Sequence, residues 1–324
     1  MTTPYRYAQM IAAGLVLAVL LVVPAIGSPF MVTQFVRILI YAIFAMSLDL
    51  LIGYCGLVSL GHAAFFGVAA YVTALLASKA GVESILITLP ASLVAAALSA
   101  AVIGALTLRT TGIYFIMATL AFAQMIYFVV QENAFFGGSD GILLLGRFRV
   151  SIGNMALLDL ASRVTLYYVV LAFTLLVFIG LWFLVRSPFG RAIQGIRANE
   201  QRMRALGFPV ARYKFVCFVI GGMLAGLAGQ FYVILTSLAD PSIVDWLHSV
   251  QVLVMLIVGG IGTLIGPALG ALVLIVLIDQ VSELTEHWKL IVGALVIAIT
   301  LFSRGGIVGL VQELGTRLFD RRPS

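Results

Sequence analysis

Apolar runs of about twenty residues recur along the whole chain, and only 10% of its 324 residues are charged. A soluble domain carries roughly 25% charged residues, whereas a helix that crosses a membrane needs ~20 mostly apolar residues. The runs are continuous and lack the alternation that marks the strands of a membrane β-barrel. Because lipid tolerates only helices and closed barrels, the sequence predicts an all-α, polytopic membrane protein.

The spacing of the runs predicts about ten transmembrane helices, within a range of eight to ten, in a single domain over 1–324. The first run follows Arg6 and resembles a signal peptide, but the many later runs favour an uncleaved first helix. The predicted spans, whose boundaries are defined to a few residues, are 8–27, 31–52, 53–79, 84–107, 111–131, 164–185, 214–237, 246–262, 263–281 and 288–304.

The basic residues predict which side of the membrane each loop faces, because short cytoplasmic loops carry an excess of Lys and Arg. With both termini inside, thirteen of the 19 basic residues lie on the inner side and five on the outer side. Three of those five lie in the outer segment 132–163, which is too long for a turn and too apolar for a solvated linker. We expect that segment to lie partly against the membrane surface.

The largest inner loop, 186–214, carries seven basic residues and one acid, Glu200. Ser187 and Pro188 give a helix-start signal, because Ser caps free N–H groups and Pro loses nothing at the first helical position. Gly207, which precedes a Phe-Pro pair, is typical of a helix end with positive φ. The loop therefore predicts a short capped helix on the cytoplasmic side.

Physical reasoning alone leaves three interpretations of that helix open. Ile193, Ile196 and Met203 fall near one face, while arginines supply the charge. Such a helix could lie on anionic lipid, could dock on a soluble partner, or could carry its charge only to satisfy the positive-inside bias.

Two Gly-rich stretches interrupt the apolar runs, GYCGLVSLGHAAFFG at 53–67 and VGGIGTLIGPALGA at 258–271. Glycine in a membrane helix allows close backbone approach, or marks a break where the backbone lines a cavity. Ser59 and His62 would be costly against lipid, so they should face protein or a water-filled path. The second stretch predicts a tight inner turn, serving either as a hinge near the cytoplasmic mouth or as close packing.

No motif indicates an enzyme. GGSDG at 137–141 matches G-x-S-x-G only formally, because a nucleophile elbow needs a strand-turn-helix setting and triad partners. The sequence contains no phosphate-binding P-loop and no H-E-x-x-H motif. Its two cysteines, Cys55 and Cys217, lie far apart in apolar surroundings and suggest small packing residues. We therefore predict no catalytic residue, no metal site and no cofactor.

Five stretches of the chain, in order, are GYCGLVSLGHAAFFGVAAYVTALL, TGIYFIMATLAFAQ, GGSDGI, SPFGRAIQGIRANEQRMRALG and GGIGTLIGPALGA. Together they closely resemble the permease subunits of branched-chain amino acid ABC importers. The combination of GIYFIMATLAFAQ with GGSDGI resembles the larger of the two paired permeases, the LivM type. The resemblance extends from about residue 35 to about residue 305.

This resemblance implies the ABC importer permease fold in a bacterial inner membrane, with both termini cytoplasmic and 132–163 periplasmic. The partners it implies are a second homologous permease subunit, two cytoplasmic ATP-binding subunits, a periplasmic substrate-binding protein and the lipid bilayer, with no nucleic acid. ATP would be bound and hydrolysed on the partner chains, so this chain would be a transporter subunit and not an enzyme.

The inner loop resembles the coupling segment that docks on the ATPase, which favours docking among the three interpretations. The residues assigned to ATPase coupling are Ser187, Pro188, Gly190, Arg191, Arg197, Glu200, Ala205 and Gly207. The residues assigned to the translocation path or to the interface with the second permease are Ser59, Gly61, His62, Gly67, Thr119, Gln124, Gly260 and Gly262.

Branched-chain or related amino acids are the implied substrates. Permeases for urea and short amides share motifs like SLGHAAFFG, and importers of this kind also handle aromatic acids, so these substrates are alternatives. An ion-coupled secondary transporter is a different class, but it would place charges in mid-membrane. Here Arg37, Asp49 and Asp279 all fall toward span ends. A non-transporting scaffold would not require a shaped, basic, capped helix.

Overall fold

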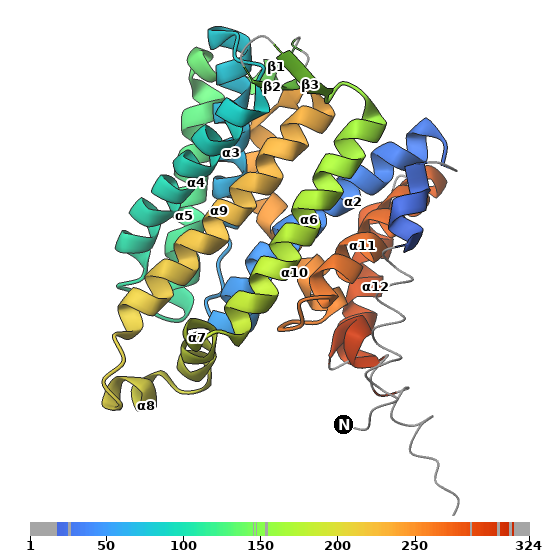
Figure 1. Ribbon diagram of the computed structural model, residues 1–324. Helices are drawn as coiled ribbons and strands as arrows, with labels where there is room; N and C mark the ends of the chain where they lie inside the picture. The colour runs from blue at the N-terminus through green and yellow to red at the C-terminus, as the bar shows by residue number, and fades with distance from the viewer. Residues whose placement is uncertain are drawn as a thin grey trace, which may run out of the picture.

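The computed structural model describes residues 18–24, 27–144, 146, 148–152, 155–285, 287–302, 305–310 and 313. Most of the predicted first span, 8–27, and the predicted cytoplasmic placement of both termini lie outside the described residues. Within them the chain is a bundle of long helices with very little sheet (Figure 1). The prediction of an all-α, polytopic membrane protein is confirmed.

Seven helices of the described part are long and apolar enough to cross a membrane. They are α2 (Pro29–Asp49) continued by the π-helix η1 (Leu50–Cys55), α3 (His62–Ala80), α4 (Ile85–Thr107), α5 (Ile113–Glu132), α6 (Arg163–Arg186), α9 (Val210–Thr236) and α11 (Gly266–Leu284). Two shorter apolar helices accompany them, α10 (Trp246–Gly259) and α12 (Trp288–Phe302). The total number of transmembrane helices stays a prediction.

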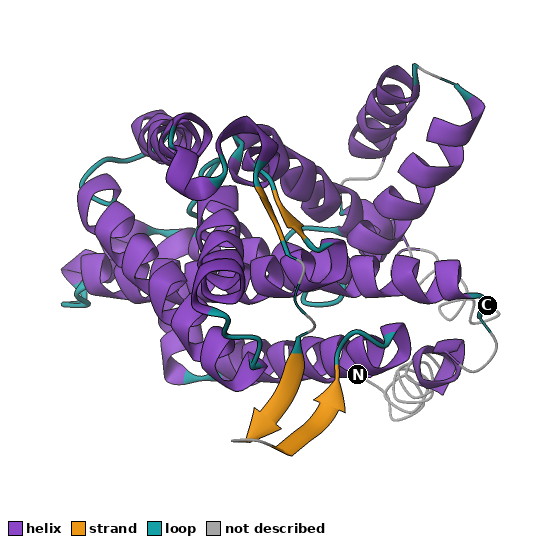
Figure 2. Cartoon of the chain, turned by 90° about the horizontal axis from the view of Figure 1, so that it is seen from above, coloured by secondary structure: helices purple, strands orange, loops and turns teal. Residues whose placement is uncertain are grey.

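One end of the bundle carries the short α7 (Pro188–Ala198) and α8 (Glu200–Ala205), and the other end carries the strands (Figure 1). Strand β1 (Ile142–Leu143) pairs antiparallel with β4 (Leu238–Ala239), and β2 (Arg149–Ile152) pairs antiparallel with β3 (Met155–Asp159). Seen from above, the β2–β3 hairpin projects at the edge of the bundle (Figure 2). GGSDG forms a turn containing the 3₁₀ helix η3 (Gly138–Asp140), not a strand-turn-helix elbow.

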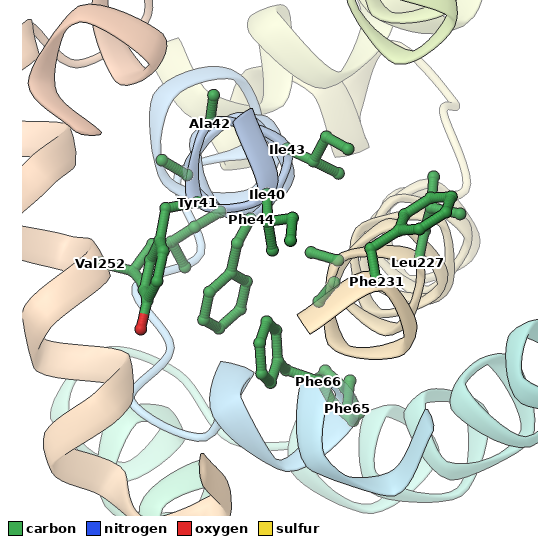
Figure 3. Close-up of a cluster of buried hydrophobic side chains, with 14 of the residues drawn as sticks. Ile40, Tyr41, Ala42, Ile43, Phe44, Phe65, Phe66, Leu227, Phe231 and Val252 are labelled. Atoms are coloured by element: carbon green, nitrogen blue, oxygen red, sulfur yellow. The ribbon is translucent and has the colours of Figure 1, made fainter. Parts of the chain in front are cut away.

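Helix α2 is the central helix of the bundle, and every residue from Ile38 to Asp49 is buried. It packs against α6, α9, α10 and α11, while α3 and α4 pack against α9. Aromatic rings fill the space between α2, α3 and α9 (Figure 3), where the ring centres of Phe44 and Phe66 lie 4.6 Å apart. In contrast, most residues of α4 and α5 are not fully buried, as expected for helices at the periphery of a membrane bundle.

The predicted span 53–79 is wrong at its start. Residues 53–55 end the preceding helix, and a connection over 56–61 leads to α3, which begins only at His62. Gly56, in the left-handed region with φ 77°, ends the π-helix, as glycine can at little cost. The glycines therefore mark a break in the helix.

The inner loop also differs from the prediction, because it forms two helices where one was expected. Asn199 separates α7 from α8, and its side-chain oxygen accepts a hydrogen bond from the Arg202 N–H at 2.9 Å. An Asn side chain competes for backbone N–H groups and so favours a new helix start over helix continuation.

Candidate functional site

The segment α7–α8, which we call the docking segment (188–205) after the role that the sequence predicts for it, is held on the bundle at its N-terminal end. The Ser187 hydroxyl accepts a hydrogen bond from the Gly190 N–H at 3.1 Å, and Pro188 occupies the first helical turn. A Cβ atom on Gly190 would overlap the carbonyl oxygens of Leu184 and Val185, so only glycine lets α7 fold so closely onto the end of α6. The predicted cap is present.

The two faces of α7 differ. Ile193 and Ile196 are buried against the bundle, whereas Pro188 and Arg191 are exposed. At the far end of the docking segment Ala205 and Gly207 are exposed as well. Gly207 has the predicted positive φ, 84°, and a Cβ there would meet no described atom within 4 Å. The face of the docking segment that points away from the bundle is therefore exposed.

Glu200 ties α8 to α9. Its carboxylate lies 2.5 Å from an Arg204 nitrogen and 2.6 Å from Lys214 Nζ at the start of α9. Partial burial raises the pKa of Glu200, but the hydrogen bonds from Lys214 and Arg204 outweigh burial, and the pKa lies below its usual 4.5. Glu200 is therefore ionised at neutral pH and holds the orientation of α8.

A second group, which we call the inner junction because the predicted topology places it on the inner side, consists of Asp49, Gly53, Arg197 and Gly262. The Arg197 guanidinium donates a hydrogen bond to the Gly53 carbonyl. Asp49, one turn before Gly53 and fully buried, accepts a hydrogen bond from the Gly262 N–H at 2.7 Å. The junction thus joins α7, the end of α2–η1 and the turn between α10 and α11.

The turn between α10 and α11 depends on its glycines. Gly260 and Gly262 have φ of 119° and 79°, values that side chains rarely adopt. The Thr263 hydroxyl closes the turn by donating to the Gly260 carbonyl at 2.8 Å. The predicted tight turn is present, and through Gly262 it is part of the inner junction.

A third group lies in the middle of the bundle, at the start of α3. A Cβ on Gly61 would overlap the Thr119 carbonyl, so the glycine lets the start of α3 approach the backbone of α5. The Ser59 hydroxyl accepts a hydrogen bond from the Gly61 N–H at 3.3 Å. Ser59, Gly61, His62 and Thr119 are all buried within this chain. The structure therefore brings these four predicted residues together.

His62 lies at the level of Ser47, about two helical turns before the end of η1. Ser47 Oγ donates its proton to the Phe44 carbonyl at 2.7 Å, so it accepts from His62 Nε2 at 2.8 Å. Because a hydroxyl has one proton to donate, this contact assigns the Nε2–H tautomer. Nδ1 then has no partner among the described residues. The imidazole stacks on Phe44, with an angle of 11° between the rings.

Helix α10 begins beside this group. The Ser249 hydroxyl accepts a hydrogen bond from the Ala63 N–H of α3 at 2.8 Å. Gln124 of α5 donates to Asp245 at 2.9 Å, directly before α10. A Cβ on Gly67 would overlap Val244, so this glycine lets α3 pack against the chain that leads into α10. Gln124 and Gly67 therefore contact the two residues directly before α10, Asp245 and Val244, and not His62 itself.

The residues that sequence reasoning missed are the partners of the predicted ones. Ser47 and Ser249 are fully buried and bond the start of α3, yet single serines in apolar runs are usual packing residues. His248 stacks on Phe44 at a ring-centre distance of 5.6 Å, on α10. Among these missed residues, only His248 carried a signal in the sequence, because it is a histidine in a short apolar run.

A polar contact in the first half of α2, which we call the outer pair because the predicted topology places it toward the outer side, joins Gln34 and Arg37 to Asp279 of α11. Arg37 lies 3.3 Å from one carboxylate oxygen, and Gln34 donates to the other. Arg37 and Asp279 neutralise one another at a partly exposed site, so Arg37 does not extend alone toward the interface.

A cavity of about 490 Å³ opens between α3, α4 and α5. Its lining is apolar and includes Gly67, Tyr71 and Val244, whereas His62 and Ser59 are not part of it. Among the residues that the structure describes, no group of His, Cys, Asp and Glu could hold a metal ion.

Membrane-length helices interrupted at glycine-rich breaks are found in membrane transporters. The chain belongs to the family described as branched-chain amino acid transport system / permease component, whose profile matches residues 30–300. The predicted resemblance to LivM-type permeases is confirmed.

Individual relatives agree with this family. The chain is 27% identical over 320 residues to the high-affinity branched-chain amino acid transport system permease protein LivM of Escherichia coli (strain K12), covering 91% of this chain and 75% of that protein. LivM of Salmonella typhimurium is also 27% identical, covering 90% and 74%. The ribose import permease protein RbsC of Escherichia coli (strain K12) is 29% identical over 134 residues, 39% of this chain and 42% of that protein. No solved structure matches the chain.

Proposed function

We propose that this chain is the transmembrane subunit of an ABC importer that moves branched-chain or related amino acids across a bacterial inner membrane. Hydrolysis of ATP on two partner subunits drives the transport, and the chain itself binds neither ATP nor a metal. It pairs with a second homologous permease, and a periplasmic binding protein delivers the substrate. Family membership supports the class of transporter, and LivM, by its name, supports the substrate.

The docking segment is the observation that carries the proposal. A capped, two-helix segment is held on the bundle by Gly190 and Glu200, while its other face is exposed. A rigid, exposed segment at the basic end of a permease is suited to receive a soluble ATPase. A helix that only bound anionic lipid would not need this fixed orientation.

The experiment reconstitutes the complete transporter in proteoliposomes and measures uptake of labelled leucine, with the binding protein outside and ATP inside. We expect uptake that requires ATP and is lost with a hydrolysis-deficient ATPase. Excess isoleucine or valine should compete with leucine, whereas urea, short amides, aromatic acids and ribose should not. Uptake driven by an ion gradient without the ATPase would overturn the proposal, and competition only by urea or aromatic acids would reassign the substrate.

The ion-coupled alternative is disfavoured by the outer pair. Coupling by a membrane-embedded charge requires a group that is free to exchange its ion. Arg37 and Gln34 occupy both carboxylate oxygens of Asp279, so this acid is engaged.

A further inference from the structure

We propose that Arg197 transmits movement of the docking segment into the membrane domain through the inner junction. The inference rests on the proposed function, because it assumes that the ATPase binds α7–α8. It assigns Arg197 as a positioning residue, with Asp49 and Gly262 as the groups through which it acts.

Arg197 joins two elements that no other described side-chain hydrogen bond joins. It lies in the last turn of α7, and its guanidinium reaches the Gly53 carbonyl in η1. Its aliphatic part lies over Gly56, where a Cβ would be 3.1 Å from Arg197 Cγ. Glycine at position 56 therefore permits this close approach. A displacement of α7 pulls or pushes the end of the central helix directly.

The Gly53 carbonyl is available because it lies at a helix end. The last carbonyls of a helix have no intrahelical partner, and the carbonyl end carries partial negative charge. The Gly56 and Leu57 N–H groups both donate hydrogen bonds to the Leu51 carbonyl, and so not to the Gly53 carbonyl. A cationic donor supplied by another element is thus the natural partner for the Gly53 carbonyl.

The same helical turn also binds the α10–α11 turn. Asp49 Oδ1 accepts the Gly262 N–H, and a Cβ on Gly53 would overlap Asp49 Oδ1 and lie 2.7 Å from Gly262 N. Three elements therefore meet where only glycine fits. Helix α10, which leads into this turn, has 14 residues, and Ser249 in its first turn accepts the Ala63 N–H from the first turn of α3. At the usual helical rise, a shift of its inner end is carried about 21 Å, to the middle of the bundle.

Asp49 gives the junction a second possible arrangement. Its Oδ2 is buried and has no hydrogen-bond partner within the described part of the chain. An arginine has five donors in a fixed fork, so Arg197 can exchange the Gly53 carbonyl for this oxygen when α7 moves. An element with two discrete arrangements is what coupling between distant sites requires.

The first test replaces Arg197 in the complete transporter and measures three quantities: retention of the ATPase, ATP hydrolysis, and leucine uptake per ATP. For Arg197→Ala we expect retention and hydrolysis close to wild type and a drop in uptake per ATP of about tenfold, within the usual range of coupling between sites. Arg197→Lys, which keeps one donor, should recover part of the ratio. Arg212→Ala, an exposed arginine at the start of α9, is the matched control and should keep it.

The second test separates transmission from a direct contact, because Arg197 is itself exposed and could touch the ATPase. Asp49 is fully buried, so no partner reaches it. Asp49→Asn keeps the acceptor for Gly262 and removes the charge. It should also lower uptake per ATP, and adding Arg197→Ala should then cost less than it does in the wild type. Strictly additive effects would overturn the inference.

The outcomes distinguish the two proposals. If the wild-type chain fails to retain the ATPase or to import leucine with ATP, the proposed function is wrong and the inference falls with it. If both hold and Arg197→Ala keeps the wild-type uptake per ATP, only the inference is wrong. Thermal unfolding of each variant in detergent checks that Arg197→Ala acts on coupling, since a merely structural role would lower the midpoint and leave the ratio intact.

Discussion

The two ends of α2 hold a buried or partly buried aspartate contact each, and the two contacts are built differently. At the outer pair, Gln34 and Arg37 satisfy both oxygens of Asp279. At the inner junction, only one oxygen of Asp49 has a hydrogen-bond partner among the described residues, the Gly262 N–H. The outer pair joins two membrane helices, whereas the inner junction joins a membrane helix, a glycine turn and the docking segment.

This difference teaches how one helix can be anchored at one end and adjustable at the other. A fully satisfied polar group favours a single arrangement, whereas a buried group left partly unsatisfied is costly and favours any arrangement that satisfies it. Glycines with positive φ at the inner end add backbone conformations that other residues lack. We therefore expect substitutions at the outer pair to change stability, and those at the inner junction to change transport.

Gly53→Val should give the largest effect. The added Cβ overlaps Asp49 Oδ1 and crowds Gly262, so the junction must open or the helix must shift. Overpacking of this kind costs about 1–3 kcal/mol or more. We expect little inserted protein, and no leucine uptake from what remains. Gly180→Val, at an exposed position of α6 where a Cβ meets no described atom, is the control and should insert normally. Wild-type uptake in Gly53→Val would contradict the close packing of the junction.

Gly207→Val should come next, because its cost is local. A side chain in the left-handed region costs about 1–2 kcal/mol, but no described atom obstructs it at Gly207. The variant should accumulate normally and lose coupled uptake, because the end of the docking segment is displaced. Gly207→Asn, which tolerates this conformation, should retain most uptake.

The same measurement distinguishes docking from lipid binding. Arg202→Gln or Arg204→Gln should do less than Gly207→Val if the segment docks on a protein, since an exposed ion pair is worth under ~1 kcal/mol. Lipid binding predicts the reverse order, because each basic residue near an anionic surface contributes ~1 kcal/mol. Full uptake in Gly207→Val, with loss in both arginine variants, would contradict docking.

Asp279→Asn tests the other end of α2. It leaves Arg37 without its anionic partner, and both side chains are partly exposed. The cost should therefore be about 1 kcal/mol. We expect a lower thermal midpoint in detergent and unchanged leucine uptake per ATP. Adding Arg37→Gln should restore part of the midpoint, because the unpaired charge is then gone. A loss of coupling in Asp279→Asn would remove the distinction between the two ends.

The sequence predicted what depends on local chemistry. Continuous apolar runs defined the membrane helices, Ser187 and Pro188 defined the start of α7, and Gly207 defined an end with positive φ. The break at Asn199 was missed because its side-chain cap competes with helix continuation on nearly equal terms. The inner junction was missed as a unit because Asp49, Arg197 and Gly262 lie far apart in sequence. Only the folded bundle brings them together.

Glu200→Gln should give the smallest effect and a defined pH dependence. Lys214 and Arg204 lower the pKa of Glu200 from its usual 4.5. Its ion pairs therefore stabilise the fold fully above that usual value and are lost only as pH falls through the lowered one. The thermal midpoints of wild type and Glu200→Gln should thus differ by a constant amount from about pH 8 to about pH 5. The difference should correspond to about 1 kcal/mol, because these ion pairs lie near the surface, and should close only in stronger acid. A gap that closes between neutral pH and about pH 6 would require a raised pKa, and would show that Glu200 does not hold α8 against α9.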